Sequence, residues 1–440
     1  MPIGGGTFTM MNKVLPGAYI NFVSVSGGVT AGSRGIAALP IPLDWGPDGQ
    51  VITMDSGDFS ANAQAIFGYD ASSVSILPVR EAFKRAKTLL VYRVNSGGEK
   101  AGKTIGGLDV TAKYSGTRGN DIKVAVLSNP DGGFDVVTYL DGIEVDRQNA
   151  AAASEVKGND FVDFEVSGTL AAAAAAALTG GTNGTANAQA YGDALTALEV
   201  EQFNVIGYPG TDTAIKALVT AYVKRLRDDE GKKVTAVLEN YASADYEGII
   251  SVKNGVVLED GTSLTAAQAV AWVTGASAAA EINESLTNTA YDGAVDVTKK
   301  YTRTQYEAAL KGGEFVFYAD SGKARVLDDI NTLVTYAGGK TSDWNSNRLV
   351  RVMDGWANDV ARIFGTGYLG LETNNDTGRQ LFKADLVSLA KQYEAIGAIS
   401  DFDSADITIV QGIGKRDVAA NCMLRPNDSM TKLYMTVVMQ

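Results

Sequence analysis

The sequence contains no histidine among its 440 residues. Histidine is the usual general base near neutral pH and the most common metal ligand in proteins. Its absence excludes Ser-His-Asp and Cys-His catalysis and nearly every type of zinc site. The composition therefore favours a structural protein over an enzyme, and we expect no catalytic residue, no metal and no cofactor.

Cysteine and long apolar runs are scarce as well. Cys422 is the single cysteine, so no disulfide can form within the chain, as is typical of proteins made in a reducing compartment. It lies in the apolar run Val418–Leu424, which predicts a buried, small hydrophobic side chain.

No apolar stretch approaches the roughly 18 residues that cross a bilayer, and Met1–Gly6 lacks the regions of a signal peptide. We therefore expect a cytoplasmic chain without membrane contact.

Positive charge is in deficit. Lys and Arg number 38 against 51 Asp and Glu, which gives 38 − 51 = −13. A nucleic-acid partner is not expected, because phosphate binding needs clustered positive charge. Apolar residues make up 45% of the chain, enough for a sizeable core, and the length predicts two to four domains.

Strand and helix patterns alternate in two stretches of the chain. Between 36 and 94, the pattern predicts a helix at Val79–Lys87 and a strand buried on both faces at Leu89–Tyr92. This alternation, which returns between 188 and 320, predicts a largely parallel or mixed sheet. In the second stretch we predict strands at Phe203–Tyr208, Val234–Leu238 and Phe315–Tyr318, and helices at Leu218–Leu226 and Leu264–Ala280, the latter capped by Thr262 or Ser263.

The residues between these two stretches have the pattern of a small all-β module. Asp131-Gly132 and Asp141-Gly142 each separate short β-rich runs, which is a hairpin signal. Val162–Val166 alternates apolar and acidic residues, as a half-buried strand does. Ala171–Ala177 follows; alanine favours helix, but so short a helix is marginal alone, and we predict a connector.

The last part of the chain predicts helices followed by short strands. Asp328 and Asp329 are expected on the face of the first helix, solvated or paired with a neighbouring subunit. The expected helices are Val326–Val334, Leu349–Ile363 and Phe382–Ile396, and the expected strands are Ile407–Val410 and Asp417–Leu424.

Both ends of the sequence stand out. Residues 1–13 are glycine-rich and predict a flexible arm, and residues 18–25 predict a strand. Met430–Gln440 is β-prone and apolar, and in a strand its odd-numbered residues from Leu433 to Met439 share one face. Such a segment must pair with another strand or risk aggregation.

One motif resembles a nucleotide site. Gly97–Thr104 fits the phosphate-binding pattern G-x-x-x-x-G-K-[ST] and follows a predicted strand, and Asp320 could serve as the acid on the magnesium side. A true site needs a helix that begins at Lys103, because the amides at its N-terminus complete the anion site. The chain continues with Ile105–Gly107, whose adjacent glycines oppose a helix. We therefore interpret the stretch as a glycine-rich linker between domains, with a nucleotide-binding enzyme or motor as the alternative.

Four stretches resemble the contractile-tail sheath proteins of phages and of bacteriocin-like particles from Gram-positive hosts. They occur in the order found in that family and together span essentially the whole chain. They are Leu15–Phe22, Pro42–Pro47, Tyr114–Asp121, and the segment from Asn331 through Trp356 to Lys432–Val437.

The resemblance implies an α+β multidomain fold. Its α/β domain would be subtilisin-like in fold only, since a chain without histidine cannot build the protease triad. The expected parts are an N-terminal arm and strand (1–26), the first part of the α/β domain (27–100), a β-sandwich insertion (101–180), the second part of the α/β domain (181–322) and a C-terminal assembly domain with a terminal strand (323–440).

The resemblance also implies a structural subunit that polymerises helically around a tail tube and contracts to drive the tube through a cell envelope. The expected partners are further copies of the chain, the tail tube protein, and baseplate and tail terminator proteins, assembled in the bacterial host cytoplasm. Another self-assembling array protein, such as a surface-array subunit, is a further alternative. The residues expected to exchange strands between subunits are Thr7, Phe8, Thr9, Leu433, Tyr434, Met435, Thr436, Val437 and Val438.

Overall fold

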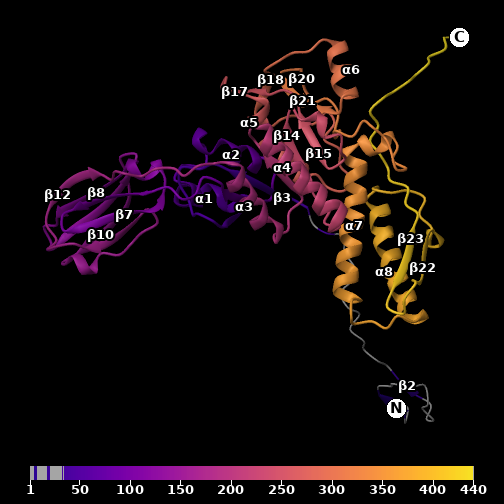
Figure 1. Cartoon of the computed structure of the whole chain (residues 1–440), viewed down its shortest axis with the longest axis horizontal. Coiled ribbons are helices and arrows are strands. Elements are labelled where there is room, and N and C mark those ends of the chain that lie inside the picture. Colours follow the sequence, from indigo (N-terminus) through magenta and orange to yellow (C-terminus); the bar gives the residue numbers. More distant parts are fainter. Residues whose placement is uncertain (1–3, 7–16, 20–31, 33, 440) are drawn as a thin grey trace. The chain divides into compact units, whose positions relative to one another are not determined.

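A computed structural model describes residues 4–6, 17–19, 32 and 34–439 (Figure 1). The chain forms two compact units. One unit comprises Met1–Gly32 and Asp359–Arg425, and the other comprises Ser33–Asn358 and Pro426–Gln440. The division falls within a single long helix, α7 (Asn347–Gly367).

A seven-stranded sheet forms the centre of the larger unit. Its strand order is β19-β15-β14-β13-β3-β5-β4, and neighbouring strands are parallel except for β4, which runs antiparallel to β5. The predicted parallel or mixed sheet is thereby confirmed. The strands are β3 (Ile36–Ile41), β4 (Val51–Asp55), β5 (Thr88–Arg93), β13 (Val205–Tyr208), β14 (Thr235–Glu239), β15 (Ile249–Val252) and β19 (Glu314–Phe315).

Helices cover both faces of this sheet (Figure 1). Leu89 and Val91 of β5 pack into one core and Leu90 and Tyr92 into the other, because successive side chains of a strand point to opposite faces. The first core contains α1 (Ser56–Phe67), α2 (Leu77–Phe83) and α5 (Ala266–Ala279), and the second contains α3 (Ala188–Glu199) and α4 (Thr213–Lys224), which continues into a π-helical turn, Arg225–Asp229.

Helix α5 is buried along almost its whole length. Its cap is Thr265, not Thr262 or Ser263, and the Thr265 hydroxyl accepts the Gln268 amide hydrogen at 3.2 Å while the Gln268 side chain accepts from the Thr265 amide. Gly275 lets α5 approach α2 closely, since a Cβ at this position would lie 2.3 Å from the Ala82 carbonyl oxygen.

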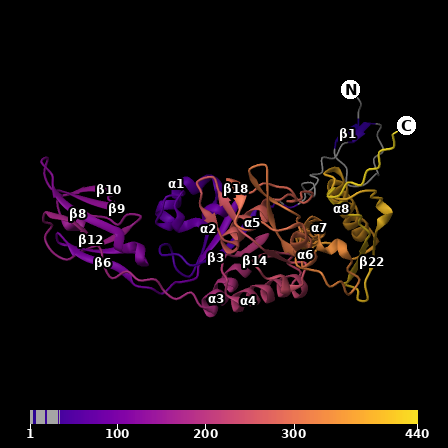
Figure 2. The ribbon, with the colours of Figure 1, turned by 90° about the horizontal axis from the view of Figure 1, so that it is seen from above.

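A β-sandwich is inserted after β5. One sheet has the order β10-β9-β8-β12 and the other β11-β7-β6, and Figure 2 gives a second view of them. The hairpin turns at Asp131-Gly132 and Asp141-Gly142 are confirmed, and the second has positive φ at both central residues. The strands are β6 (Lys100–Ile105), β7 (Leu108–Ser115), β8 (Ile122–Ser128), β9 (Phe134–Leu140), β10 (Ile143–Ala150), β11 (Val162–Val166) and β12 (Ala173–Ala177).

The alanine run is a strand, so the predicted connector is wrong. β12 pairs antiparallel with β8, with Ala176 opposite Val124 and Ala177 opposite Lys123. Ala173 and Ala176 pack against the sandwich core, which the buried side chain of Leu178 joins. Pairing and packing outweigh the helix preference of alanine because that preference amounts to less than about 1 kcal/mol per residue.

Two buried arginines join the sandwich to the α/β core. Arg93 of β5 is fully buried and donates to the carbonyl oxygens of Leu43 and Ser115 at 3.0 and 2.9 Å. Arg118, from the sandwich, donates to the Gly68 carbonyl at 2.8 Å and forms a bidentate ion pair with Asp141.

The apolar run Phe315–Tyr318 is divided between two sheets. Phe315 ends β19, and Phe317 begins β20 (Phe317–Asp320), which forms a hairpin with β21 (Lys323–Val326). Strand β18 (Ala294–Val297) lies beside this hairpin and forms a three-stranded sheet with β16 (Val256–Leu258) and β17 (Ser263–Leu264), and helix α6 (Arg303–Lys311) packs on β19.

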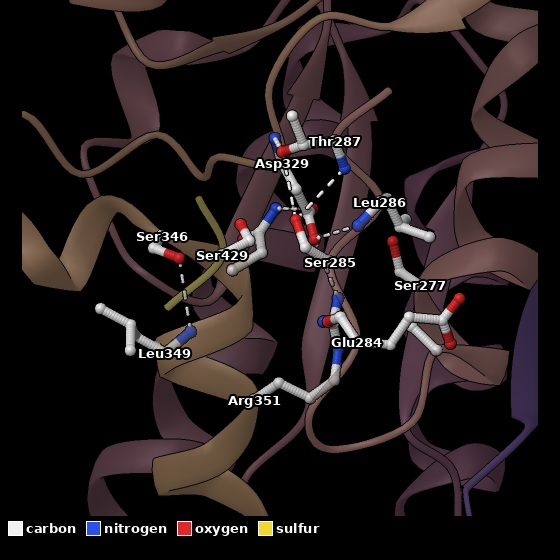
Figure 3. A network of polar contacts seen from close by, with 12 residues as sticks. Ser277, Glu284, Ser285, Leu286, Thr287, Asp329, Ser346, Leu349, Arg351 and Ser429 are labelled. Carbon is white, nitrogen blue, oxygen red and sulfur yellow. Dashed lines mark hydrogen bonds and ion pairs between the residues drawn. The ribbon is translucent and has the colours of Figure 1, made fainter. Parts of the chain in front are cut away.

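The predicted helix Val326–Val334 is wrong, because Val326 ends β21 and an irregular segment follows. Asp329 is 2% exposed rather than lying on an exposed helix face. Its carboxylate accepts the Leu286 amide at 3.0 Å and the Asn347 side-chain amide at 2.9 Å (Figure 3). These bonds satisfy a buried charge and hold the segment in a non-helical path.

The smaller unit contains the end of α7, helix α8 (Asp376–Ala395), and the strands β22 (Ile407–Gln411) and β23 (Val418–Cys422). The helical and strand predictions for these residues are confirmed. Near the start of the chain, β1 (Gly4–Gly6) pairs in parallel with β2 (Gly17–Tyr19), and the rest of the predicted strand 18–25 lies outside the described residues. Within the described part of the chain, no helix is long and apolar enough to cross a bilayer.

Candidate assembly site

Strands β22 and β23 form an antiparallel hairpin that has, among the described residues, no third strand. The register pairs Ile407 with Cys422 and Gln411 with Val418. Each strand therefore has a strand neighbour on one side only. A two-stranded sheet is marginally stable by itself, and its open edges present main-chain groups that another strand can pair with.

Helix α8 covers one face of this hairpin (Figure 1). Asn375 caps the helix by accepting the Gly378 amide hydrogen at 2.8 Å. Ile407 of β22 is buried, and opposite it Cys422 is half-buried rather than fully buried as predicted. Desolvation raises the pKa of the Cys422 thiol. The register places Val418, Ala420 and Cys422 on the face towards the helix.

A cavity of about 280 Å³ lies in the same unit, between the helices and the beginning of β23. Phe364 and Tyr368 come from α7 and the residue after it, Phe382 from α8 and Val418 from β23. The Phe382 ring lies 5.5 Å from that of Phe364 and 4.8 Å from that of Tyr368. This aromatic lining suits an apolar side chain.

The rim of the cavity is polar and mixed in charge. Arg379, Lys415, Arg416 and Glu372 line it, and Arg379 forms an ion pair with Asp376. The Tyr368 hydroxyl donates to the Asp385 carboxylate at 2.5 Å, and desolvation together with this bond raises the pKa of Tyr368, so the phenol stays protonated. The polar end of Tyr368 is thus occupied, and its ring is left as an apolar wall.

Residues 426–439, here named the C-terminal arm, contain no helix or strand in the described chain. The predicted exchange residues Leu433–Val438 all lie in this arm, whereas Thr7, Phe8 and Thr9 lie outside the described residues. The large apolar side chains of the arm are between 73% and 103% exposed, which is typical of a protein-interaction segment. They are Met430, Leu433, Tyr434, Met435, Val437, Val438 and Met439.

The phosphate-loop motif is built differently from a nucleotide site. Lys103 and Thr104 lie in strand β6, and the Thr104 hydroxyl donates to the Asp109 carboxylate across the β6–β7 turn at 2.6 Å. The prediction that no helix follows the motif is confirmed, whereas the linker interpretation is wrong for the part from Lys100 onwards. Asp320 lies in the β20–β21 hairpin and pairs with Arg325. The described residues contain no cluster of three or more potential metal-ligating His, Cys, Asp or Glu side chains.

Sheath family models match four consecutive segments that together span most of the chain. The chain belongs to the phage tail sheath protein family. The matches are the tail sheath protein Gp18 domain III N-terminal region (34–94), the phage tail sheath protein β-sandwich domain (96–183), the phage tail sheath protein central domain (184–332) and the phage tail sheath C-terminal domain (339–440).

Relatives of full length support this assignment. The chain is 37% identical to the uncharacterized protein YqbK and 36% identical to the phage-like element PBSX protein XkdK, both of Bacillus subtilis, over 99% of each chain. The crystal structure of a sheath tail protein from Desulfitobacterium hafniense superimposes with a TM-score of 0.86 at 46% identity, covering 96% of this chain and 99% of that one. The helical sheath of the anti-feeding prophage in its contracted state has the same fold, with a TM-score of 0.57 at 12% identity over 96% of this chain and 99% of that one.

Proposed function

We propose that this chain is the subunit of a contractile tail sheath, which polymerises helically around a tail tube and contracts to drive the tube through a target envelope. One observation carries the proposal: a single chain combines an exposed apolar arm with a two-stranded hairpin to which no other described strand is paired. Membership of the sheath family and the fold shared with a contracted helical sheath support it.

Subunits are joined by strand exchange. Leu433–Val438 of one copy extend the β22–β23 hairpin of another, and Thr7–Thr9 contribute a further strand. Strand addition provides main-chain hydrogen bonds, and alternate side chains provide specificity. A contact of this head-to-tail kind does not close on itself and so generates a helical array. Several such contacts per subunit add up through multivalency.

The parts of the chain have different roles in this proposal. Residues 27–100 and 181–322 form a subtilisin-like α/β domain, which the three-layer arrangement around the central sheet supports. Residues 101–180 form the inserted sandwich, and residues 1–26 and 323–440 make the assembly contacts. The tail tube, baseplate and tail terminator proteins are the remaining partners, and assembly takes place in the host cytoplasm.

In this mechanism, contraction consumes no nucleotide. The subunits move as rigid bodies while the exchanged arms act as hinges and keep the lattice connected. The extended lattice is metastable and is released from its baseplate end. The strand that replaces a nucleotide-site helix at Lys103 agrees with a mechanism driven by stored conformational energy.

Negative-stain electron microscopy of purified protein tests the proposal directly. We expect the full-length chain to form ringed tubes or sleeves, alone or with tail tube, and a variant lacking residues 430–440 to remain monomeric. A matched full-length control, Lys103→Ala, should assemble like the native chain. The proposal is wrong if the full-length chain stays monomeric at every concentration with tube present, or if purified sheath–tube particles contract only when ATP is added.

A further inference from the structure

The aromatic cavity lies on one particular side of the β22–β23 hairpin. Its lining includes Val418 of β23 and Lys415 and Arg416 directly before that strand, and none of its described lining residues belongs to β22. Helix α8, by contrast, packs on β22. The cavity therefore adjoins the start of β23 rather than β22, and a strand added beside β23 would run past it.

The register of the hairpin determines which side chains of an added strand face this cavity. Val418, on the helix-facing side of β23, lines the cavity, whereas Ala419 beside it is exposed. In a strand paired with β23, every second side chain points to the same face as Val418. Those side chains extend the inner layer of the hairpin over Phe364, Tyr368 and Phe382.

The C-terminal arm has one face that suits this environment. In an extended strand, the odd-numbered positions from Leu433 to Met439 are all apolar, whereas the even face mixes Lys432, Tyr434 and Thr436 with the apolar Val438. The rim is mixed in charge, because Glu372 lines it together with Arg379, Lys415 and Arg416, so charge does not distinguish the two faces. Methionine has the flexibility to fill an irregular cavity and makes favourable sulfur–aromatic contacts. Apolarity and period thus both favour the odd face.

We propose that the cavity is a socket for odd-face side chains of a second copy's arm, with Met435 or Met439 inserted against Phe364, Tyr368 and Phe382. The inference rests on the strand exchange proposed above and adds the strand beside which the arm runs, the face that it buries and the pocket that it fills. Insertion removes from water a side chain that is 73% exposed at Met435 and 93% exposed at Met439 in the single chain.

Photocrosslinking in assembled polymers tests the orientation of the arm. A photoreactive phenylalanine analogue replaces Met435 or Val437 on the odd face, or Tyr434 or Thr436 on the even face, and each variant is co-assembled with nitrogen-15-labelled native chain. We expect odd-face probes to crosslink to residues 364–382 or 415–418 of a labelled copy, as identified by mass spectrometry. The socket is overturned if even-face probes give these crosslinks equally well, or if odd-face probes crosslink elsewhere.

Filling the cavity from within tests its occupancy independently. Val418→Trp should raise the critical concentration for assembly about tenfold or more, since excluding a methionine from an apolar site forfeits the burial of its side chain. Ala419→Trp places the same side chain on the opposite face of β23 and should assemble as the native chain does. Circular dichroism and thermal melting of both variants, in a chain lacking 430–440, establish that each is folded.

The outcomes separate the socket from the strand exchange on which it rests. If the chain lacking 430–440 still assembles, strand exchange by the arm is refuted and the socket with it. If that deletion abolishes assembly while Val418→Trp and Ala419→Trp assemble alike, strand exchange stands and the socket is refuted. A selective defect in Val418→Trp supports both.

Discussion

The ion pair between Arg227 and Asp354 allows a quantitative test of how the larger unit is held together. Arg227, in the π-helical turn after α4, is 2% exposed, and its guanidinium lies 2.6 and 2.9 Å from the two carboxylate oxygens of Asp354 in α7. It also donates to the Val234 carbonyl at 2.9 Å. Burial lowers the pKa of Arg227, and the charge and hydrogen bonds of Asp354 outweigh that effect and raise it.

Asp354→Ala should destabilise the α4–α7 contact by about 3–5 kcal/mol, because it leaves a buried guanidinium without a counter-charge. The double variant Arg227→Met/Asp354→Leu removes both charges and should recover most of this loss. Glu307→Ala is the control, since its partner Arg303 is 93% exposed and the pair contributes no more than about 0.5 kcal/mol.

Native-state hydrogen exchange of the α4 and α7 amides measures these differences locally, which avoids assuming a single unfolding transition for a multidomain chain. The reasoning is refuted if Asp354→Ala costs as little as Glu307→Ala. It is also refuted if the double variant is as unstable as the single one, since the lost stability would then not come from an uncompensated charge.

Three further outcomes follow from single residues. Burial raises the pKa of Asp328 above 3.8, so the folded chain binds the carboxyl proton more tightly than the unfolded chain, and the native chain loses stability as pH rises through the folded-state pKa. In urea denaturation, Asp328→Asn should therefore gain stability relative to the native chain between pH 3.5 and 7. A stability difference between the two chains that stays constant with pH would contradict this. Cys422, on the inner face of β23, should be alkylated more slowly in assembled sheath than in the chain lacking 430–440, and equal rates would exclude a strand added beside β23. Isothermal titration of the native chain and of Lys103→Ala with ATP and magnesium should give no binding heat, and heat lost in the variant would revive the nucleotide site.

Local sequence patterns were sufficient to predict a helix, strand or turn wherever one physical cause determines it. The continuous apolar run at Leu89–Tyr92 predicts a strand covered on both faces, and β5 is an interior strand of a sheet that is covered on both faces. The apolar stripes of α7 and α8 recur at helical spacing, so their long helices were predictable. Asp-Gly pairs predicted the sandwich hairpins because positive φ in tight turns favours these residue types: both Asp141 and Gly142 have positive φ, and in the first turn Gly132 and Gly133 do.

Patterns failed where distant residues determine the path of the chain. The run Phe315–Tyr318 looks continuous, but the Asn254 side chain bonds both the Phe317 amide and its carbonyl at 2.9 Å, in the manner of a neighbouring strand, where the chain leaves the central sheet. The helix expected at Val326–Val334 is prevented by Asp329, whose partners Leu286 and Asn347 are remote in sequence. Neither set of bonds leaves a local periodic signal.

One part of the candidate assembly site could be predicted from the sequence, and the other could not. The arm is visible in the sequence because an alternating apolar segment without a partner is itself a signal. The socket is not, because Phe364, Phe382 and Val418 belong to three elements and each looks like an ordinary core residue of its own element. The cavities between elements depend on how those elements pack together. The residue periodicity within one element carries no information about that packing.

The alanine run allows the balance between local preference and tertiary pairing to be measured. Ala177 of β12 faces Lys123 of β8 on the outer side of the sandwich, and Ala308 is exposed in helix α6. Because threonine suits strands and disfavours helices, Ala177→Thr should stabilise the pairing of β12 with β8 by a few tenths to about 1 kcal/mol, whereas Ala308→Thr should destabilise α6 by about 0.5 kcal/mol. Hydrogen exchange of the β8 and α6 amides reads out both. If Ala177→Thr were destabilising to the same degree as Ala308→Thr, the segment would be following its helical preference in solution, and pairing with β8 would not be what fixes its conformation.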